Sequence, residues 1–195
     1  MATVDDFKAK LSGGGARPNL FRVTVNFPAF ARGDTQLASF MVKGAQLPGT
    51  TIGQVEVPFQ GRVVKLAGDR TFEPMSLTVI NDIGMEVRNA FERWANGISN
   101  SKSAVGYTNP SSYQSDVIIE QLTKNGGVSK RYKLVGAFPT SIAAVDLSFD
   151  TTDAIEEFTV ELSYQYFEAS AVNNGSVGSE ILSRAVDAVR SITGI

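Results

Sequence analysis

The sequence of 195 residues contains no cysteine and no histidine. Without cysteine there is no disulfide, no thiolate nucleophile and no zinc–thiolate site. Without histidine, the commonest general base and the commonest metal-binding side chain are both missing. We therefore expect neither a catalytic centre nor a bound cofactor or metal, and we predict that the protein is not an enzyme.

Charge of one sign and long apolar runs are also scarce. The 18 basic and 20 acidic side chains give a net charge of −2, which does not favour tight binding of phosphate backbones. No apolar run approaches the roughly 18 residues that span a bilayer, and the start of the chain carries Asp5 and Asp6 where a signal peptide is basic and apolar. We therefore expect a soluble protein without a membrane anchor, made in a cytoplasm.

Alternating apolar and polar residues predict a mainly β domain. The clearest alternation covers residues 157–167, where Glu157, Thr159 and Glu161 share the side that faces water. Prolines and the pairs Gly68-Asp69 and Asn125-Gly126 are interpreted as strand ends and turns. The predicted strands cover residues 19–27, 36–42, 52–59, 62–66, 75–80, 115–124, 128–138, 142–149 and 157–167.

One helix is predicted in the middle of the chain, over residues 83–96. Asp82 is placed to cap its first turn, and Asn96-Gly97 is placed to end it. Apolar residues at steps of three and four form one stripe that must be buried. The stripe consists of Ile83, Val87, Ala90, Phe91, Trp94 and Ile98. We interpret the single tryptophan as a core anchor below the sheet.

The two ends of the chain are expected to differ from the central domain. The domain is predicted over residues 1–168, and residues 1–18 form a flexible N-terminal arm with a short helix at 3–11. Gly13-Gly14-Gly15 suits a linker better than a phosphate-binding loop, because no Gly-Lys-Ser/Thr follows it. Residues 169–195 are predicted to be a linker and a C-terminal helical extension, with the helix at 180–192.

Three polar groups allow a functional and a plain structural interpretation. The acidic residues between Asp146 and Glu157 suit a solvated turn better than a calcium loop, whose spacing they do not match. Lys130, Arg131 and Lys133 are too few to hold DNA and suit a solvated strand face. Arg70 is equally suited to an inter-subunit clamp and to an intramolecular ion pair.

Three segments together resemble the tail tube proteins of contractile-tailed (myovirus) bacteriophages. The central one contains Ala67-Gly68-Asp69-Arg70-Thr71-Phe72, then Leu77-Thr78-Val79-Ile80-Asn81-Asp82, then the helix with Phe91 and Trp94. The others are Ala16-Arg17-Pro18-Asn19-Leu20-Phe21 and Glu156-Glu157-Phe158-Thr159-Val160-Glu161-Leu162. The resemblance covers residues 4–167, and the chain after Glu168 departs from the pattern.

The resemblance implies a β-sandwich or closed β-barrel with one packed helix. It also implies a structural virion protein that forms stacked hexameric rings inside a contractile sheath. The resulting tube conducts DNA into the host without binding it specifically. The implied partners are further copies of the chain and the sheath, baseplate and tail-terminator proteins. The implied location is the virion tail, assembled in the host bacterial cytoplasm.

A turn at Gln60-Gly61 joins the predicted strands 52–59 and 62–66 into a protruding hairpin. The resemblance, joined to the flexibility of the arm and of this hairpin, also suggests where subunits meet. Ring-to-ring contacts are expected at Val4, Phe7, Leu11, Leu47, Gln54, Glu56, Arg62, Asp69 and Arg70. The lumen is expected to be polar or acidic, and Glu157, Thr159 and Glu161 are the candidate lining residues.

Other functions remain open on the sequence alone. The nearest is the inner tube of a phage-derived contractile injection or secretion system, which carries effectors in place of a genome. A carboxylate-based enzyme needs a deep pocket around residues 146–157. A nucleic-acid binding module needs salt-dependent affinity for DNA or RNA.

Overall fold

The structure is a computed structural model that describes residues 3–10 and 15–171. These residues form two compact units, of which the larger comprises residues 22–119 and 132–169 and the smaller includes residues 15–21 and 120–131. The predicted C-terminal helix at 180–192 lies outside the described residues. The elements are α1 (Val4–Lys10), β1 (Phe21–Val25), η1 (Ala29–Ala31), α2 (Thr35–Met41), β2 (Val42–Ala45), β3 (Thr50–Phe59), β4 (Arg62–Phe72), β5 (Met75–Ile80), α3 (Glu86–Ile98), α4 (Pro110–Tyr113), β6 (Ser115–Leu122), β7 (Val128–Ile142), β8 (Glu157–Ser163) and β9 (Tyr166–Ala171).

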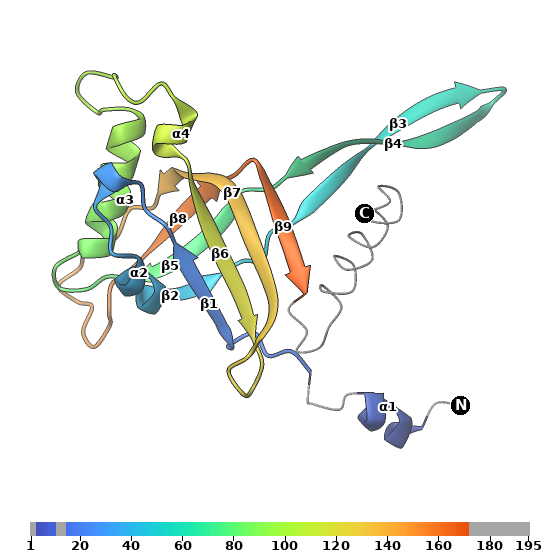
Figure 1. The fold of residues 1–195 in the computed structure, drawn as a ribbon, viewed down its shortest axis with the longest axis horizontal. Coiled ribbons are helices and arrows are strands. Elements are labelled where there is room, and N and C mark those ends of the chain that lie inside the picture. The colour runs from blue at the N-terminus through green and yellow to red at the C-terminus, as the bar shows by residue number, and fades with distance from the viewer. Residues whose placement is uncertain (1–2, 11–14, 172–195) are drawn as a thin grey trace, which may run out of the picture. The chain divides into compact units, whose positions relative to one another are not determined.

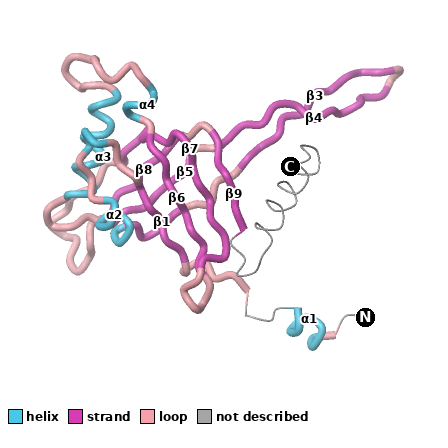
Figure 2. The backbone as a smooth tube through the Cα atoms, in the orientation of Figure 1, coloured by secondary structure: helices cyan, strands magenta, loops and turns pink. Residues whose placement is uncertain are grey.

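Seven strands form the main sheet, and two more form a separate hairpin (Figures 1 and 2). The order of the main sheet is β1-β6-β7-β8-β5-β2, and β9 also pairs with β7. The predicted mainly β class is confirmed. The sheet is open, with β1 and the four-residue β2 at its ends, so a single chain does not complete the closed barrel that we expected.

One face of the sheet and one face of α3 enclose the core of the larger unit. Leu77 of β5 pairs with Val160 of β8, and both are fully buried. Phe91 of α3 reaches Phe158 of β8 with ring centroids 6.4 Å apart. Trp94 stacks on Phe91 and donates its indole N–H to the carbonyl of Tyr113 at 2.6 Å. The predicted role of Trp94 as a core anchor is therefore confirmed.

Helix α3 begins and ends later than the sequence predicts. Asp82 does accept from the backbone N–H of Glu86 at 3.0 Å, but it does so across a turn in which Met85 has a φ of 50°. Ile83 therefore lies before the helix, and its side chain is fully exposed instead of joining the apolar stripe. The helix also continues through Gly97 to Ile98. The left-handed residue that was expected to end it at Asn96-Gly97 is not found there.

Gly97 is needed for packing, because the ring of Phe30 lies against its backbone. A Cβ added at Gly97 would lie 2.2 Å from Cε2 of Phe30. We predict that Gly97→Ala lowers the free energy of unfolding by about 1–3 kcal/mol. This loss is expected even though alanine is intrinsically more favourable than glycine inside a helix. Urea unfolding of the monomer measures this effect. Asn96→Ala, at the neighbouring position, is the control, and stability equal to that of the wild type in Gly97→Ala would contradict the packing argument.

The predicted strand at 36–42 is wrong, because Thr35–Met41 form α2. Asp34 starts this helix by accepting from the backbone N–H groups of Gln36 at 2.8 Å and Leu37 at 3.1 Å. Such a cap satisfies donors that a helix start otherwise leaves unpaired. Only Val42–Ala45 is extended, and it pairs with β5.

Three further strand boundaries also differ from the prediction. Strand β7 runs past Pro139 to Ile142, because a register shift between Pro139 and Ser141 accommodates the residue without an N–H. Residues 143–156 then form a loop and not the predicted strand. The predicted strand at 157–167 is divided into β8 and β9. Between them, the backbone N–H of Gln165 donates to the carbonyl of Val135 at 3.0 Å.

Candidate assembly surfaces

The β3–β4 hairpin has little cover from the rest of the larger unit. Figure 1 shows it extending away from the main sheet, and β3 and β4 pair only with each other. Every residue of β3 is exposed, as is almost every residue of β4. An isolated two-stranded hairpin is marginally stable in water, so cover from another molecule would stabilise this one.

The two faces of the hairpin differ in polarity. The pairs Val55–Leu66, Val57–Val64 and Phe59–Arg62 are opposite each other, and such pairs at alternate positions share one face. We call the side chains of Val55, Val57, Phe59, Val64 and Leu66 the distal apolar face. Each of them is between 43% and 63% exposed. Covering all five is worth on the order of 5 kcal/mol before the costs of association.

The opposite face of the hairpin is mainly polar. It carries Gln54 and an exposed ion pair between Glu56 and Lys65, whose charged atoms are 3.7 Å apart. Exposed pairs of this kind contribute little to stability. Of the predicted ring-contact residues, Gln54 and Glu56 therefore lie on the polar face, whereas Arg62 lies at the tip beside Phe59.

Strand β4 continues through Gly68 and Asp69, so the predicted turn at these residues is wrong. The register shifts between Ile52 and Gln54, where β4 has one residue more than β3. A Cβ at Gly68 would lie 3.2 Å from the backbone of Gly53, which explains the glycine at this crossing. Beyond the shift, Arg70 pairs with Ile52. No ion pair to Arg70 is found in the described part of the chain, and its role stays a prediction.

Aromatic packing holds the base of the hairpin to the main sheet. The ring of Phe72, the last residue of β4, lies 6.0 Å from that of Tyr164 and 5.7 Å from that of Phe167. Burial raises the pKa of Tyr164, and the nearby charge of Glu73 adds to this shift. The hairpin therefore has a fixed base and an uncovered end.

The N-terminal helix α1 is another exposed apolar element. Val4 and Phe7 are 70% and 66% exposed. Thr3 and Asp6 cap the helix reciprocally, since the backbone N–H of each is bonded to the side chain of the other. The bond from Thr3 lowers the pKa of Asp6. Leu11, which was predicted to share this surface, lies outside the described residues. Leu47, in the loop before β3, is 51% exposed.

The polar face of the main sheet contains the predicted lumen residues. Glu157, Thr159 and Glu161 share this face of β8, because they alternate with the buried Phe158, Val160 and Leu162. Lys43 of β2 contacts Glu157 at 2.5 Å. The three side chains thus share one face, as predicted. The basic partner of Glu157 was not predicted, because no local pattern relates residues so far apart in the chain.

The basic side chains of β7 are also neutralised by carboxylates. Arg131 contacts the buried Glu120 at 2.7 Å, and Lys133 contacts Asp116 at 2.9 Å. The hydrogen bond to Asp116 raises the pKa of Lys133. These pairs leave little free positive charge for a phosphate backbone, which supports the interpretation of a solvated strand face.

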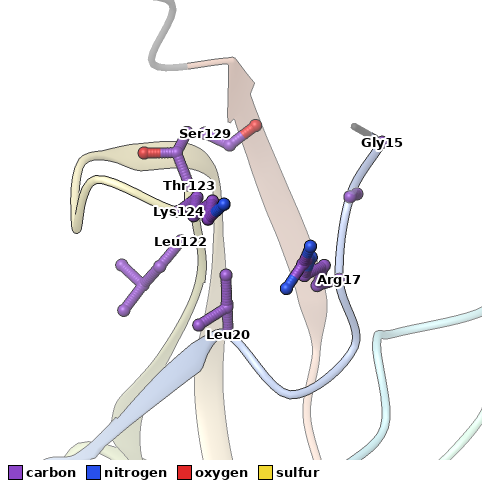
Figure 3. Close-up of a pocket in the computed structure, with 8 residues that line it drawn as sticks. Gly15, Arg17, Leu20, Leu122, Thr123, Lys124 and Ser129 are labelled. Carbon is purple, nitrogen blue, oxygen red and sulfur yellow. The ribbon is translucent and has the colours of Figure 1, made fainter. Parts of the chain in front are cut away.

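The pocket near the β6–β7 turn offers little to a small ligand, and the described residues offer little to a metal ion. A pocket of about 240 Å³ near the β6–β7 turn is lined by Arg17, Lys124 and Ser129, among others (Figure 3). Both basic side chains are exposed, and no buried polar group of the described chain is directed into the pocket. Within residues 3–10 and 15–171, no three acidic side chains gather to hold a metal ion. In the same residues, no helix has the length and apolar character needed to cross a membrane.

Comparison with known proteins gives a consistent result. Residues 16–170 match the model of a family described as phage tail tube protein. The tail tube protein of Serratia phage KSP90 is 34% identical over 173 residues, which cover 87% of this chain and 97% of the relative. The tail tube protein gp19 of Enterobacteria phage T4 is 30% identical over 167 residues, covering 85% and 99%.

Solved structures share the fold at lower identity. The tube-terminating cap of the anti-feeding prophage superposes with a TM-score of 0.62 at 19% identity, covering 81% of this chain and 92% of the other. The sheath–tube complex of an extracellular contractile injection system, PVC, gives a TM-score of 0.62 at 15% identity, covering 88% and 100%. At such identities the likeness concerns the fold alone.

Proposed function

Because this chain belongs to the phage tail tube protein family, we propose that it is the repeating subunit of the hollow tube in a contractile phage tail. The observation that carries this role is the exposed hairpin, whose apolar face has no cover on its own chain. The relatives are structural proteins, and we propose the same for this chain, without catalytic activity. Its place is then the virion tail, after assembly in the host bacterial cytoplasm.

The tube is proposed to consist of stacked hexameric rings. Strands β1 and β2, at the two ends of the open sheet, present unpaired backbone groups that a neighbouring copy satisfies within a ring. Sheath, baseplate and tail-terminator proteins are the proposed further partners. A tube seen together with its sheath in the PVC complex supports the first of these.

Ring-to-ring contacts are proposed at the exposed surfaces of α1, the loop before β3 and the hairpin. They include Val4, Phe7 and Leu47, together with the hairpin candidates Gln54, Glu56, Arg62, Asp69 and Arg70. The distal apolar face adds residues that the sequence did not indicate. Its five side chains supply the apolar contact area that the polar candidates lack.

The polar face of the main sheet is proposed to line the lumen. Threonine and carboxylate side chains on this face do not attract phosphates, and Lys43, the lysine that contacts them in the described chain, is paired with Glu157. A conduit for DNA benefits from such a surface, because basic side chains slow a phosphate backbone by binding it. DNA then passes without specific contacts.

Reversing charge on this face tests the lumen assignment. We predict that Glu157→Lys together with Glu161→Lys slows DNA release from assembled particles several-fold, because the lumen then binds phosphates. Release is followed by fluorescence of a DNA-binding dye after the tail is triggered. The control is Glu157→Gln with Glu161→Gln, which removes charge without reversing it. Unchanged release in the lysine variant would place these residues outside the lumen.

Electron microscopy of the purified chain tests the proposed function itself. Negatively stained samples at increasing protein concentration should contain rings and then tubes of constant diameter. A protein that stays strictly monomeric at high concentration would contradict the role. The alternative of an injection-system tube that carries effectors shares this architecture. The relatives at 30–34% identity are phage proteins, which favours the genome-conducting role.

A further inference from the structure

We propose that the distal apolar face of one copy docks into a pocket in the loop 143–156 of the next copy along the tube. This pocket lies at the far end of the same sheet and has an acidic rim. The inference rests on the proposed assembly of identical subunits, and it assigns the two surfaces that meet. Two independent features of the larger unit support it, namely apolar complementarity and charge.

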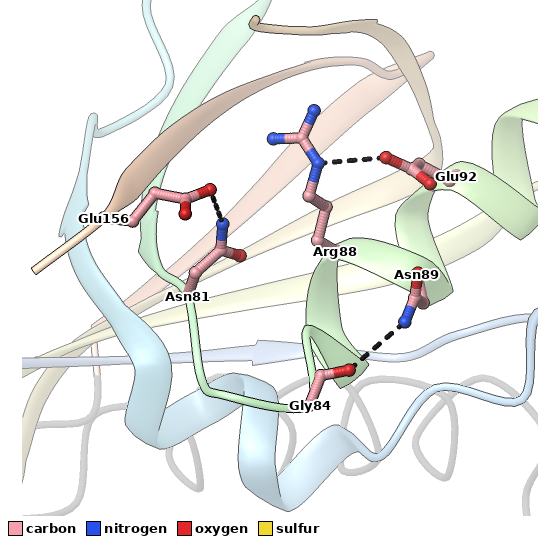
Figure 4. Close-up of polar contacts among 6 residues, drawn as sticks. All are labelled: Asn81, Gly84, Arg88, Asn89, Glu92 and Glu156. Carbon is pink, nitrogen blue, oxygen red and sulfur yellow. Dashed lines mark hydrogen bonds and ion pairs between the residues drawn. The ribbon is translucent and has the colours of Figure 1, made fainter. Parts of the chain in front are cut away.

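The pocket belongs to a group of loops held together by defined hydrogen bonds. Asn81, just after β5, donates its backbone N–H to the carbonyl of Glu156 at 2.9 Å. The side chain of Asn81 also donates to the carboxylate of Glu156 at 2.6 Å (Figure 4). The loop 81–85 is therefore tied to the end of the loop 143–156, next to the paired residues Ile80 and Glu157.

Apolar side chains around this pocket lack cover on their own chain. The pocket has a volume of about 420 Å³, within the range that encloses a drug-sized molecule, so it has room for the side chains of a hairpin tip. Leu147 and Ile155, which line it, are 83% and 71% exposed. Phe149 and Ile83, in the same two loops, are fully exposed. Such a cluster marks an interaction surface.

The hairpin and the pocket lie at opposite ends of the same strands. Strand β4 ends at Phe72, and β5 begins at Met75 opposite Leu162, near the end of β8. The loops 81–85 and 143–156 lie at the other end of β5 and β8. A strand of six residues is about 20 Å long, so about this distance separates these loops from the base of the hairpin. Figure 1 shows the hairpin directed away from these loops. One chain therefore cannot fill its own pocket, whereas head-to-tail copies fill each other's, and such a contact repeats along an axis.

Charge on the two surfaces is complementary. Arg62 is at the hairpin tip, opposite Phe59 on the apolar face. The loop of the pocket carries Asp146, Asp150 and Asp153, which are all exposed. In the described part of the chain no ion pair engages Arg62 or these three aspartates, whereas Glu156 and Glu157 bind Asn81 and Lys43. Opposite charges at a rim orient two surfaces as they approach.

Charge reversal gives one test of this docking. Arg62→Glu should raise the protein concentration needed for tube formation at least ten-fold. Combining it with Asp146→Lys and Asp150→Lys should return that concentration to within about two-fold of the wild type, because the rim then attracts the new carboxylate. A loss of assembly without this rescue, or no loss at all, would overturn the proposed contact.

Covalent trapping gives a direct test, since the native chain has no cysteine. In Gln60→Cys with Thr151→Cys, one thiol is at the hairpin tip and the other is at the pocket. A short bismaleimide should convert assembled protein into a ladder of dimers, trimers and longer multimers on a denaturing gel. Each single variant should stay monomeric, and an equal mixture of the two should give dimers only.

The other outcomes of trapping separate failure of this inference from failure of the proposed function. Tubes that form without any ladder would overturn the docking and leave the tube role standing. Dimers formed by Gln60→Cys alone would also overturn it, because hairpin tips would then meet each other. A protein that forms no tubes and no ladder would overturn the proposed function, and this inference with it.

Discussion

Replacing Val57 and Val64 by asparagine should strongly reduce tube assembly while the core of the chain stays folded. The two side chains are opposite neighbours in the middle of the distal apolar face, 43% and 47% exposed. Asparagine removes apolar area and adds polar groups that a partner would have to cover without hydrogen bonds. We expect the assembled fraction, measured by sedimentation and electron microscopy, to fall by more than ten-fold.

The opposite face of the same hairpin provides a matched control. Ile52 and Val63 are 50% and 56% exposed, and they lie on the polar face of the hairpin with Gln54 and Glu56. Ile52→Asn with Val63→Asn makes the same chemical change and should reduce assembly far less. Both double variants should keep the melting temperature of the monomer within a few degrees, because neither touches the core. Equal loss of assembly in the two variants would mean that the distal apolar face has no special role.

Replacing Trp94 by alanine produces the largest expected loss of stability. Trp94 is fully buried, with Phe27 and Phe91 against its ring at centroid distances of 5.8 and 6.2 Å. Truncation leaves a cavity and removes the donor to the carbonyl of Tyr113, so we expect a loss of about 3–5 kcal/mol in the free energy of unfolding. Urea unfolding of dilute, monomeric protein measures it.

Ile83 is the natural control for Trp94. The sequence places both on one helical stripe, but the side chain of Ile83 is fully exposed in the structure. Ile83→Ala should therefore change the free energy of unfolding by less than about 0.5 kcal/mol. If Ile83→Ala cost as much as Trp94→Ala, Ile83 would have to be buried on the helical stripe, and a start of α3 at Glu86 would be wrong.

Strands with one buried face were predictable, because successive side chains of a strand point to opposite faces and apolar residues then occur at every second position. The sequence assigns Glu157, Thr159 and Glu161 to the side that faces water, so the alternating Phe158, Val160 and Leu162 belong to the core, and all three are buried. The hairpin was predictable from the Gln60-Gly61 turn, and both residues have positive φ. The same alternation in β3 contained the signal for the distal apolar face, since Val55, Val57 and Phe59 occupy every second position.

The remaining features depend on contacts between residues far apart in the sequence. Glycine signals a turn, but Gly68 is needed because the backbone of Gly53 approaches it from the partner strand. Proline signals a strand end, but the register shift at Pro139 lets β7 continue. The pocket in the loop 143–156 depends on the bonds between Asn81 and Glu156, which are 75 residues apart. Local patterns contain no information on such pairs.

Hydrogen exchange of the hairpin amides, followed in monomer and in assembled tube, tests the central claim most directly. If an identical copy covers the hairpin, peptides from residues 50–72 should exchange at least ten-fold more slowly in the tube than in the monomer. Peptides from the buried strand β5 should change little, because their own chain already protects them. Equal exchange of residues 50–72 in the two states would contradict the claim that assembly completes the hairpin.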